Sequence, residues 1–133
     1  MNDWYDEIGK GYINLLVPDT RIAKLVRTAL GDVESVANIG AGAGNYEPED
    51  CEVIAIEPSS VMLGQYQGKG ARLQGTAETL PLATGSVDAT MGILTLHHWK
   101  NWRQGIDEML RVSRKAAMLL THKPDLFDFL LLD

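Results

Sequence analysis

The feature that most constrains the fold of this chain is an apolar segment that runs directly into three alternating glycines. Residues 36–39 read Val-Ala-Asn-Ile, and Gly40, Gly42 and Gly44 follow at every second position. Glycines at such a point let the backbone approach a ligand without interference from Cβ atoms. A second apolar segment then ends in Glu57, and a carboxylate at the end of the next parallel strand can accept both hydroxyls of a ribose. Together the two features predict a pocket for a nucleoside-containing cofactor.

The composition is that of a soluble globular protein with one domain. The chain has 133 residues, of which 45% are hydrophobic and 23% charged, and its net charge is -6. This negative balance, with no basic run, argues against binding to nucleic acid or to anionic membranes. Cys51 is the only cysteine, so no internal disulfide is possible and a reducing compartment is indicated. No apolar stretch approaches the length of a membrane span, so we expect a cytoplasmic protein.

Helical and strand-like segments alternate along the chain. After Pro18, Asp19 or Thr20 is placed to cap a helix, and Gly31 is a typical C-terminal stop. The alternation that follows implies right-handed crossovers and a parallel sheet with helices on both faces. We therefore expect an α/β fold with a Rossmann-like, doubly wound sheet. The predicted strands cover residues 35–39, 52–57, 71–74, 86–94 and 116–121, and the predicted later helices cover about 60–66 and 101–112.

Two segments do not fit a complete domain of this kind. The connection between Gly40 and Cys51 is too short for a full helical crossover, so we expect only one turn of helix there. The end of the chain, residues 127–133, is almost wholly apolar, although chain termini are normally exposed. We expect these residues either to form a helix that lies on the sheet or to mark a chain that has been cut short.

Four sequence blocks occur in an order and spacing that are specific only in combination. They cover residues 5–12, 38–44, 56–59 and 77–99, the last with Val87-Asp88-Ala89-Thr90 and Leu96-His97-His98-Trp99. In this combination the chain resembles the class I S-adenosylmethionine-dependent methyltransferases. Within that family it is most similar to the branch of small-molecule methyltransferases of quinone biosynthesis (methyltransferase type 11). The resemblance runs from about Tyr5 to Thr121.

The resemblance implies methyl transfer with S-adenosyl-L-methionine as cofactor and S-adenosyl-L-homocysteine as product. It also implies one cofactor-binding domain over residues 1–133, with N-terminal helices in 1–31 and the core in 32–133. In the family the glycine loop wraps the methionine end of the cofactor, and the acid after the second strand holds the ribose. The next residue and a segment after the third strand border the adenine, and residues of the fourth strand lie beneath the sulfonium. By position, the implied cofactor-binding residues are Asn38, Gly40, Ala41, Gly42, Gly44, Glu57, Pro58, Thr76, Ala77, Glu78, Gly92 and Ile93.

The chain departs from the family pattern at three points. Asn38 stands where the family usually has an acid that helps bind the amino group of the cofactor, and Thr76 where it often has an aspartate that accepts from adenine. Both changes predict weaker cofactor affinity. We also count five strands, in the order 3-2-1-4-5, where the family sheet has seven. An unsealed edge strand invites pairing with another chain, which predicts either C-terminal truncation or a homodimer through the exposed fifth strand or the apolar C-terminus.

His97 and His98 close the fourth predicted strand, on the side where a methyl acceptor would lie. An imidazole titrates near neutral pH, so either histidine is a candidate general base. We favour a structural role, because no third residue is visibly placed to orient a base, but we expect one histidine to border the pocket. Neither has companions at metal-ligand spacing, so we expect no metal site.

Three functions are compatible with the sequence. Methyl transfer to a small organic acceptor is favoured, because the sulfonium is already reactive and the protein mainly positions the reactants and excludes water. A NAD(P)-dependent oxidoreductase has the same doubly wound fold, but its fingerprint needs two residues before the third glycine, and here only Ala43 stands there. The third function is a degenerate methyltransferase fold that acts as a binding or assembly module without activity.

Overall fold

The computed structural model describes residues 19–93, 95, 98–120 and 129–132 of the chain. The expected N-terminal helices before residue 19, the candidate residue His97 and part of the apolar C-terminal segment lie outside these described residues. None of the helices in the described ranges is long and apolar enough to cross a membrane.

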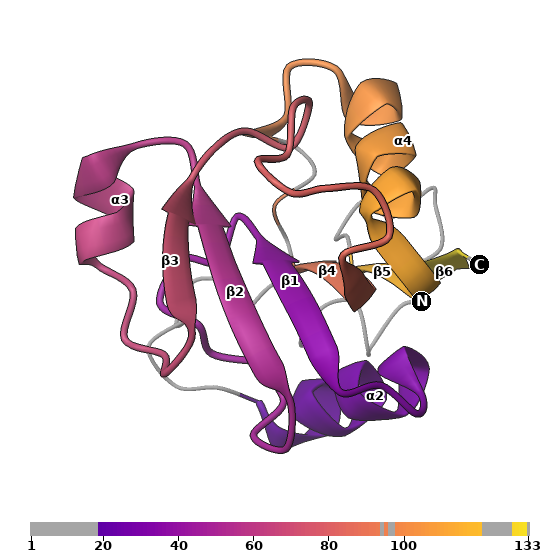
Figure 1. Cartoon of the computed structure of the whole chain (residues 1–133). Coiled ribbons are helices and arrows are strands. Elements are labelled where there is room, and N and C mark those ends of the chain that lie inside the picture. Colours follow the sequence, from indigo (N-terminus) through magenta and orange to yellow (C-terminus); the bar gives the residue numbers. More distant parts are fainter. Residues whose placement is uncertain (1–18, 94, 96–97, 121–128, 133) are drawn as a thin grey trace, which may run out of the picture.

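The described strands form one six-stranded sheet in the order β3-β2-β1-β4-β5-β6 (Figure 1). The first five strands run parallel to one another, and β6 is antiparallel to β5. The predicted α/β class and the strand order 3-2-1-4-5 are confirmed. The strands are β1 (Ser35–Ile39), β2 (Glu52–Glu57), β3 (Ala71–Gln74), β4 (Val87–Ile93), β5 (Ser113–Leu120) and β6 (Phe129–Leu132).

The edge strand β6 corrects two expectations about the C-terminal part of the chain. Residues 129–132, for which a helix was one of our expectations, pair with β5, Leu132 opposite Ala117 and Phe129 opposite Leu120. Within the described residues the sheet therefore has six strands rather than the expected five. A short apolar run fits a strand and a helix equally well by periodicity, and the open backbone groups of β5 favour the strand. Because β6 pairs with Ala117–Leu120, this part of β5 is not the exposed edge that we expected a homodimer to use.

The helices in the described residues begin at clear capping residues. The side chains of Asp19, Ser59 and Asn101 each accept a hydrogen bond from a backbone N–H two or three positions further on. Such caps satisfy N–H groups that have no partner within the helix. The helices are α2 (Thr20–Leu30), α3 (Ser60–Gly64) and α4 (Trp102–Val112).

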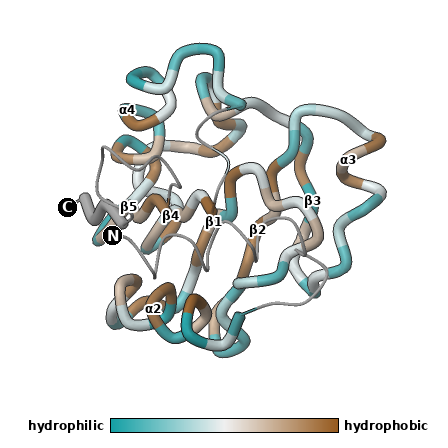
Figure 2. Tube along the Cα trace, turned by 180° about the vertical axis from the view of Figure 1, so that it is seen from behind, coloured by the Kyte–Doolittle hydropathy of each residue, from teal (hydrophilic) through white to brown (hydrophobic). Residues whose placement is uncertain are grey.

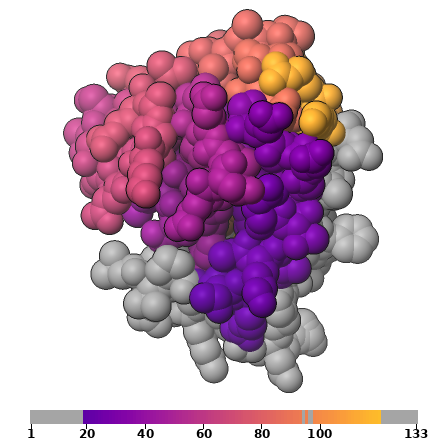
Figure 3. All heavy atoms as spheres, turned by 60° about the horizontal axis from the view of Figure 1, so that its bottom comes forward, coloured from indigo at the N-terminus to yellow at the C-terminus, as the bar shows by residue number. Residues whose placement is uncertain are grey.

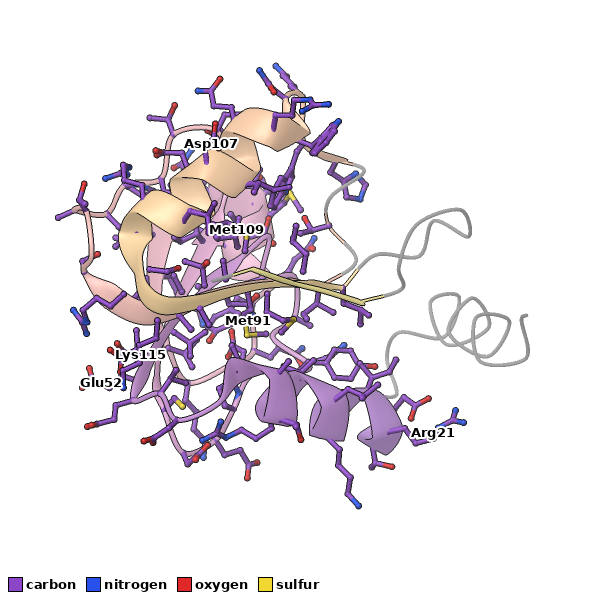
Figure 4. The ribbon with its side chains drawn as sticks, turned by 90° about the vertical axis from the view of Figure 1, so that its right-hand side faces the viewer. Arg21, Glu52, Met91, Asp107, Met109 and Lys115 are labelled. Atoms are coloured by element: carbon purple, nitrogen blue, oxygen red, sulfur yellow. The ribbon has the colours of Figure 1, made fainter. Side chains whose placement is uncertain are left out.

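Two apolar clusters hold α2 and α4 against opposite faces of the sheet. Figure 4 shows the sheet edge-on, with α4 above it and α2 below it. Met109 fills the upper interface and Met91 the lower one, and both side chains are fully buried. Burial of a methionine side chain contributes roughly 1.5–3 kcal/mol. Figure 2 shows the same pattern by hydropathy, with hydrophobic segments along the central strands and along α2.

The connection from β1 to β2 contains turns and no helix, in place of the single helical turn that we expected. Its centre is held by Tyr46, which is 8% exposed and packs in the cluster beneath the sheet with α2. The Tyr46 hydroxyl accepts a hydrogen bond of 3.0 Å from the backbone N–H of Asp19, at the start of α2. One buried tyrosine therefore anchors this short crossover. In Figure 3, which brings the lower side forward, the indigo and purple early residues form much of the surface.

Candidate functional site

The carboxyl ends of β1, β2 and β4 meet at one edge of the sheet. The last residue of β1, Ile39, pairs with Ile56 of β2. On its other side β1 pairs with β4, where Asn38 lies opposite Met91. The strand order reverses between β1 and β4, and ligands of open α/β sheets bind outside the carboxyl ends of the strands at such a point. The topology therefore favours the position that the sequence motifs predicted.

The glycine loop leaves β1 and folds over the end of β2. Its first two N–H groups donate to the carbonyl oxygen of Ile56, at 2.8 and 3.3 Å. Gly40, Gly42 and Gly44 have φ angles of 69°, 57° and 85°, a region that glycine enters without steric penalty. A Cβ atom on Gly40 would lie 2.9 Å from the Cβ atom of Thr95, whereas one on Gly42 would meet nothing within 4 Å. Packing therefore requires Gly40, and Gly42 faces open space.

A cavity of about 200 Å³ lies beside this loop, between the end of β1 and the residues that follow β4. Five residues singled out from the sequence border it, namely Asn38, Ala41, Gly42, Ile93 and His98. They come from two separate stretches of the chain, at the ends of β1 and β4, which the sheet brings together. The remaining residues of the wall are Ala43, Asn45, Tyr46, Met62 and Thr95.

Asn38 presents its side chain to this cavity from the middle of the sheet. Its backbone is paired with β2 on one side and β4 on the other, and the residue is only 3% exposed. The side-chain Nδ2 donates to the carboxylate of Glu47 over 2.8 Å. Among the described residues, none donates a hydrogen bond to Asn38 Oδ1. A buried amide oxygen without a donor is uncommon in a folded protein.

Glu57 lies against the glycine loop rather than in the wall of the cavity. The residue is 2% exposed, and its Oε2 accepts a hydrogen bond from the backbone N–H of Gly42. No described residue donates to the other carboxylate oxygen. The last side chain of β2 thus contacts the loop that follows β1, and one of its oxygens is left for a further donor.

The residues predicted to border adenine lie beyond the ends of β2 and β3, outside the cavity. Pro58 and Thr76 are exposed. The carboxylate of Glu78 accepts a hydrogen bond of 3.0 Å from the backbone N–H of Asn101, at the start of α4. The backbone carbonyl of Glu78 accepts another, of 2.8 Å, from the side chain of Gln104. The structure thus gives Glu78 a contact that holds α4, and it does not bring this segment together with Asn38.

Three further predicted residues occupy packing positions. Ala77 belongs to the apolar cluster that includes α4. A Cβ atom on Gly92 would lie 2.9 Å from the side chain of Leu119. A Cβ atom on Gly44 would lie 2.8 Å from the ring of Tyr66. These positions keep neighbouring side chains in place, and they do not themselves line the cavity.

Thr95, Tyr46 and Met62 border the cavity but did not stand out in the sequence. Thr95 is 7% exposed and follows the end of β4. Its place after a parallel strand was a usable signal, because such residues commonly line sites in open α/β sheets. Tyr46 and Met62 reach the cavity through contacts with residues distant in sequence, and no local pattern marks them.

A larger cavity, of about 710 Å³, lies at the opposite end of the sheet. Ser35, Glu52 and Val87, at the amino ends of β1, β2 and β4, line it together with Glu47 and Gly68. Ligands of open α/β sheets bind at the carboxyl ends of the strands rather than at these ends. We therefore place the candidate site at the smaller cavity.

Residues 37–121 match a family model described as methyltransferase domain. Over 91 residues the chain is 33% identical to an uncharacterized methyltransferase of Mycobacterium tuberculosis. This alignment covers 63% of the present chain and 37% of that protein. The chain therefore spans well under half the length of this relative.

Two solved structures share the fold. A candidate methyltransferase from an antibiotic biosynthesis pathway of Anabaena variabilis is 35% identical, with a TM-score of 0.72, over 79% of this chain and 46% of that chain. An S-adenosylmethionine-dependent methyltransferase of Thermotoga maritima is 29% identical, with a TM-score of 0.62, over 74% of this chain and 48% of that chain. Since the family model covers the glycine loop, the end of β2 and the strands around them, this chain belongs to the methyltransferase domain family.

Proposed function

We propose that this chain binds S-adenosyl-L-methionine at the carboxyl ends of β1, β2 and β4 and takes part in methyl transfer to a small organic acceptor. Its membership of the methyltransferase domain family supports the reaction class. The S-adenosylmethionine dependence of the Thermotoga maritima relative supports the cofactor. The net charge of -6 makes a polyanionic acceptor such as nucleic acid unfavourable.

The observation that carries this proposal is a pair of buried acceptor atoms beside the glycine loop. Asn38 Oδ1 and one oxygen of Glu57 receive no hydrogen bond from a described residue, although the two residues are 3% and 2% exposed. Buried polar atoms normally have partners, so these atoms indicate a ligand that donates hydrogen bonds. An ammonium group and ribose hydroxyls are donors of this kind. Gly42 leaves open space beside them, so the residues present fit the cofactor.

Each residue has a defined part in this proposal. Asn38 accepts from the ammonium group through Oδ1, and Glu57 accepts from the ribose hydroxyls. Gly42 lets the backbone approach the methionine end, because a side chain there would stand in the open space. Pro58 and the segment 76–78 border the adenine, beyond the ends of β2 and β3. When bound, the cofactor supplies a methyl group on a sulfonium that is already reactive toward nucleophiles.

The methyl acceptor would approach from the side of the residues after β4. Ile93, Thr95 and His98 border the cavity there, and they shape the space and exclude water around the acceptor. His98 is exposed, and its backbone N–H donates to the carbonyl oxygen of Thr95 at 2.9 Å. His98 therefore forms part of the wall of the site and transfers no proton, because positioning is the main requirement of this chemistry.

Calorimetric titration with three ligands tests the proposed function. S-adenosylmethionine and S-adenosylhomocysteine should both bind with one site per chain and raise the melting temperature. NAD⁺ should release no heat under the same conditions. Binding of NAD⁺ alone would favour the oxidoreductase, and a melting temperature unchanged by all three ligands would favour a binding module. Either of these results would reject the proposal.

A further inference from the structure

The carboxylate of Glu47 joins three segments of the chain behind the candidate cofactor cavity. Its Oε2 accepts from Nδ2 of Asn38 at 2.8 Å, and its Oε1 accepts from the hydroxyl of Tyr66 at 2.6 Å. The Tyr66 hydroxyl in turn accepts from the backbone N–H of Gly70 at 3.0 Å. Glu47 borders the larger cavity at the other end of the sheet and not the smaller one. Its hydrogen bond to Asn38, which borders the smaller cavity, connects it to the candidate site.

The direction of every hydrogen bond in this network is determined by chemistry. Burial, together with the hydrogen bond to Glu47, raises the pKa of Tyr66 to about 12. The phenol is therefore protonated at neutral pH, and since its oxygen already accepts from Gly70, its single proton is donated to Glu47. A carboxylate can only accept. Both of its partners must consequently present donors.

This requirement decides the orientation of the Asn38 amide. The two ends of an amide have nearly the same shape and opposite hydrogen-bonding character. If the amide turned over, Oδ1 would face the carboxylate oxygen and the hydrogen bond would be lost. With Nδ2 held by Glu47, the acceptor end of Asn38 faces away from Glu47. In the described part of the chain no donor occupies it, and the residue borders the cavity.

We propose that Glu47 is a positioning residue that keeps the amide oxygen of Asn38 available to the ammonium group of the cofactor and adds a negative charge behind it. This inference rests on the proposed function. The chain lacks an acid at position 38 itself, and Glu47 supplies a carboxylate one hydrogen bond further from the cavity. A negative charge at that place attracts the ammonium group of the zwitterionic amino-acid end, which a ligand without an amino group lacks.

Two ligands separate this role from a structural one. S-adenosylmethionine carries the ammonium group, whereas 5′-methylthioadenosine shares the adenosine but has a neutral thioether sulfur and lacks the whole amino-acid end. S-adenosylhomocysteine has the same neutral sulfur and keeps the ammonium group, so it should respond to E47Q as S-adenosylmethionine does. In E47Q, glutamine keeps the size of the side chain but can accept from only one of the two donors. Affinity for S-adenosylmethionine should fall about tenfold, the effect of one hydrogen bond to a charged group. Affinity for 5′-methylthioadenosine should change less than about twofold, within the scatter of distant substitutions.

A swap of the amide and carboxyl groups between the two positions provides the rescue. In the double variant N38D/E47Q, the introduced aspartate accepts from the amide of the introduced glutamine, whose oxygen accepts from the hydroxyl of Tyr66. The charge and both hydrogen bonds therefore return. Its affinity for S-adenosylmethionine should recover to within about threefold of the wild-type value. E49Q is the matched control, since Glu49 is an exposed glutamate on the same connection. It removes one negative charge and should leave the affinity for both ligands unchanged.

The outcomes distinguish this inference from the proposed function. Glu47 does not position Asn38 if E47Q weakens the binding of both ligands equally or leaves S-adenosylmethionine binding unchanged. The same conclusion follows if N38D/E47Q does not restore the affinity. If E47Q does not fold, the double variant N38D/E47Q still tests the inference. A folded N38D/E47Q that binds S-adenosylmethionine about tenfold more weakly than wild type would contradict it. Failure of the wild-type chain to bind either ligand would instead overturn the proposed function, and the inference with it.

Discussion

Gly42 donates its backbone N–H to the carboxylate of Glu57, so the last residue of β2 holds the loop that follows β1. The two residues were singled out separately, one for backbone access and one for ribose binding. Their contact means that the shape of the loop and the position of the carboxylate depend on each other. A loop that is already folded loses less conformational entropy when a ligand binds.

Replacement of Glu57 by alanine should weaken S-adenosylmethionine binding at least about tenfold, or about 1.4 kcal/mol. The variant loses the acceptor for the ribose and also releases the N–H of Gly42. Titration calorimetry measures the effect. Glu52→Ala is the control, because it removes the same charge from the exposed amino end of the same strand. Equal affinities for wild type and Glu57→Ala would exclude Glu57 from the site.

Alanine at Gly40 should reduce stability more than alanine at Gly42, whereas alanine at Gly42 should reduce cofactor affinity more. Gly40→Ala places a Cβ atom 2.9 Å from that of Thr95 at a φ of 69°, so it should destabilise the fold by roughly 1–3 kcal/mol. Gly42→Ala meets nothing within 4 Å and carries only backbone strain of about 1–2 kcal/mol. The melting temperature of Gly42→Ala should therefore fall less than that of Gly40→Ala, whereas its affinity for the cofactor should fall more. Thermal unfolding and titration calorimetry on both variants measure the two effects. If Gly42→Ala were the less stable variant and Gly40→Ala the weaker binder, Gly42 would not face the cofactor.

Gly105 lies inside α4, where helix propensity alone predicts that alanine would stabilise by about 1 kcal/mol. The structure predicts the opposite, because a Cβ atom there would lie 2.7 Å from Cζ3 of the Trp99 ring. Gly105→Ala should destabilise by about 1–3 kcal/mol through overpacking. Gly64→Ala, in α3 with nothing within 4 Å of its Cβ position, is the matched control and should be neutral or stabilising. Urea unfolding of the two variants checks the difference in sign.

Protonation of Asp88 should lower the free energy of unfolding in acid. The backbone N–H of Glu34 first, and then the guanidinium of Arg114, lower the pKa of Asp88 below its usual 3.8. A lowered folded-state pKa gives stability that is present above the unfolded-state value and is lost as the pH falls through the folded-state value. The melting temperature should therefore drop below about pH 4.

Replacement of Asp88 by asparagine isolates this contribution. The variant should melt at a lower temperature than wild type at neutral pH and show a flatter dependence between about pH 5 and pH 2. Asp107→Asn, at an exposed position on α4 (Figure 4), is the comparison and should follow the wild-type curve. Parallel curves for Asp88→Asn and wild type would show that Asp88 contributes nothing to the acid sensitivity.

Local sequence was sufficient for the central strands and for the caps. The runs that became β1 and β2 are apolar, bounded by glycine or charged residues, and of strand length, so their boundaries followed from composition. Asp19 was recognisable as an N-cap, and Gly31 as a C-terminal stop. The strand order followed from the resemblance of the motifs to a known family. Each of these signals resides in residues that are close together along the chain.

The C-terminal strand could not be predicted in this way. Phe129–Leu132 is a short apolar run, and its conformation depends on whether an open strand edge lies nearby. That edge belongs to β5, which only the folded sheet places beside it. Thr95 reaches the wall of the cavity for a similar reason, because it packs against Gly40, far from it in sequence.

By itself the sequence determined that this chain is an α/β protein in which a glycine loop is followed by a strand that ends in a glutamate. Backbone preferences and apolar periodicity are local properties, and residues 36–57 express them plainly. Only the tertiary structure decided that Glu47 turns its carboxylate to Asn38 and that Gly42 binds Glu57. Hydrogen bonds of this kind depend on distances of a few ångströms between separate segments, and no pattern along the chain specifies such distances.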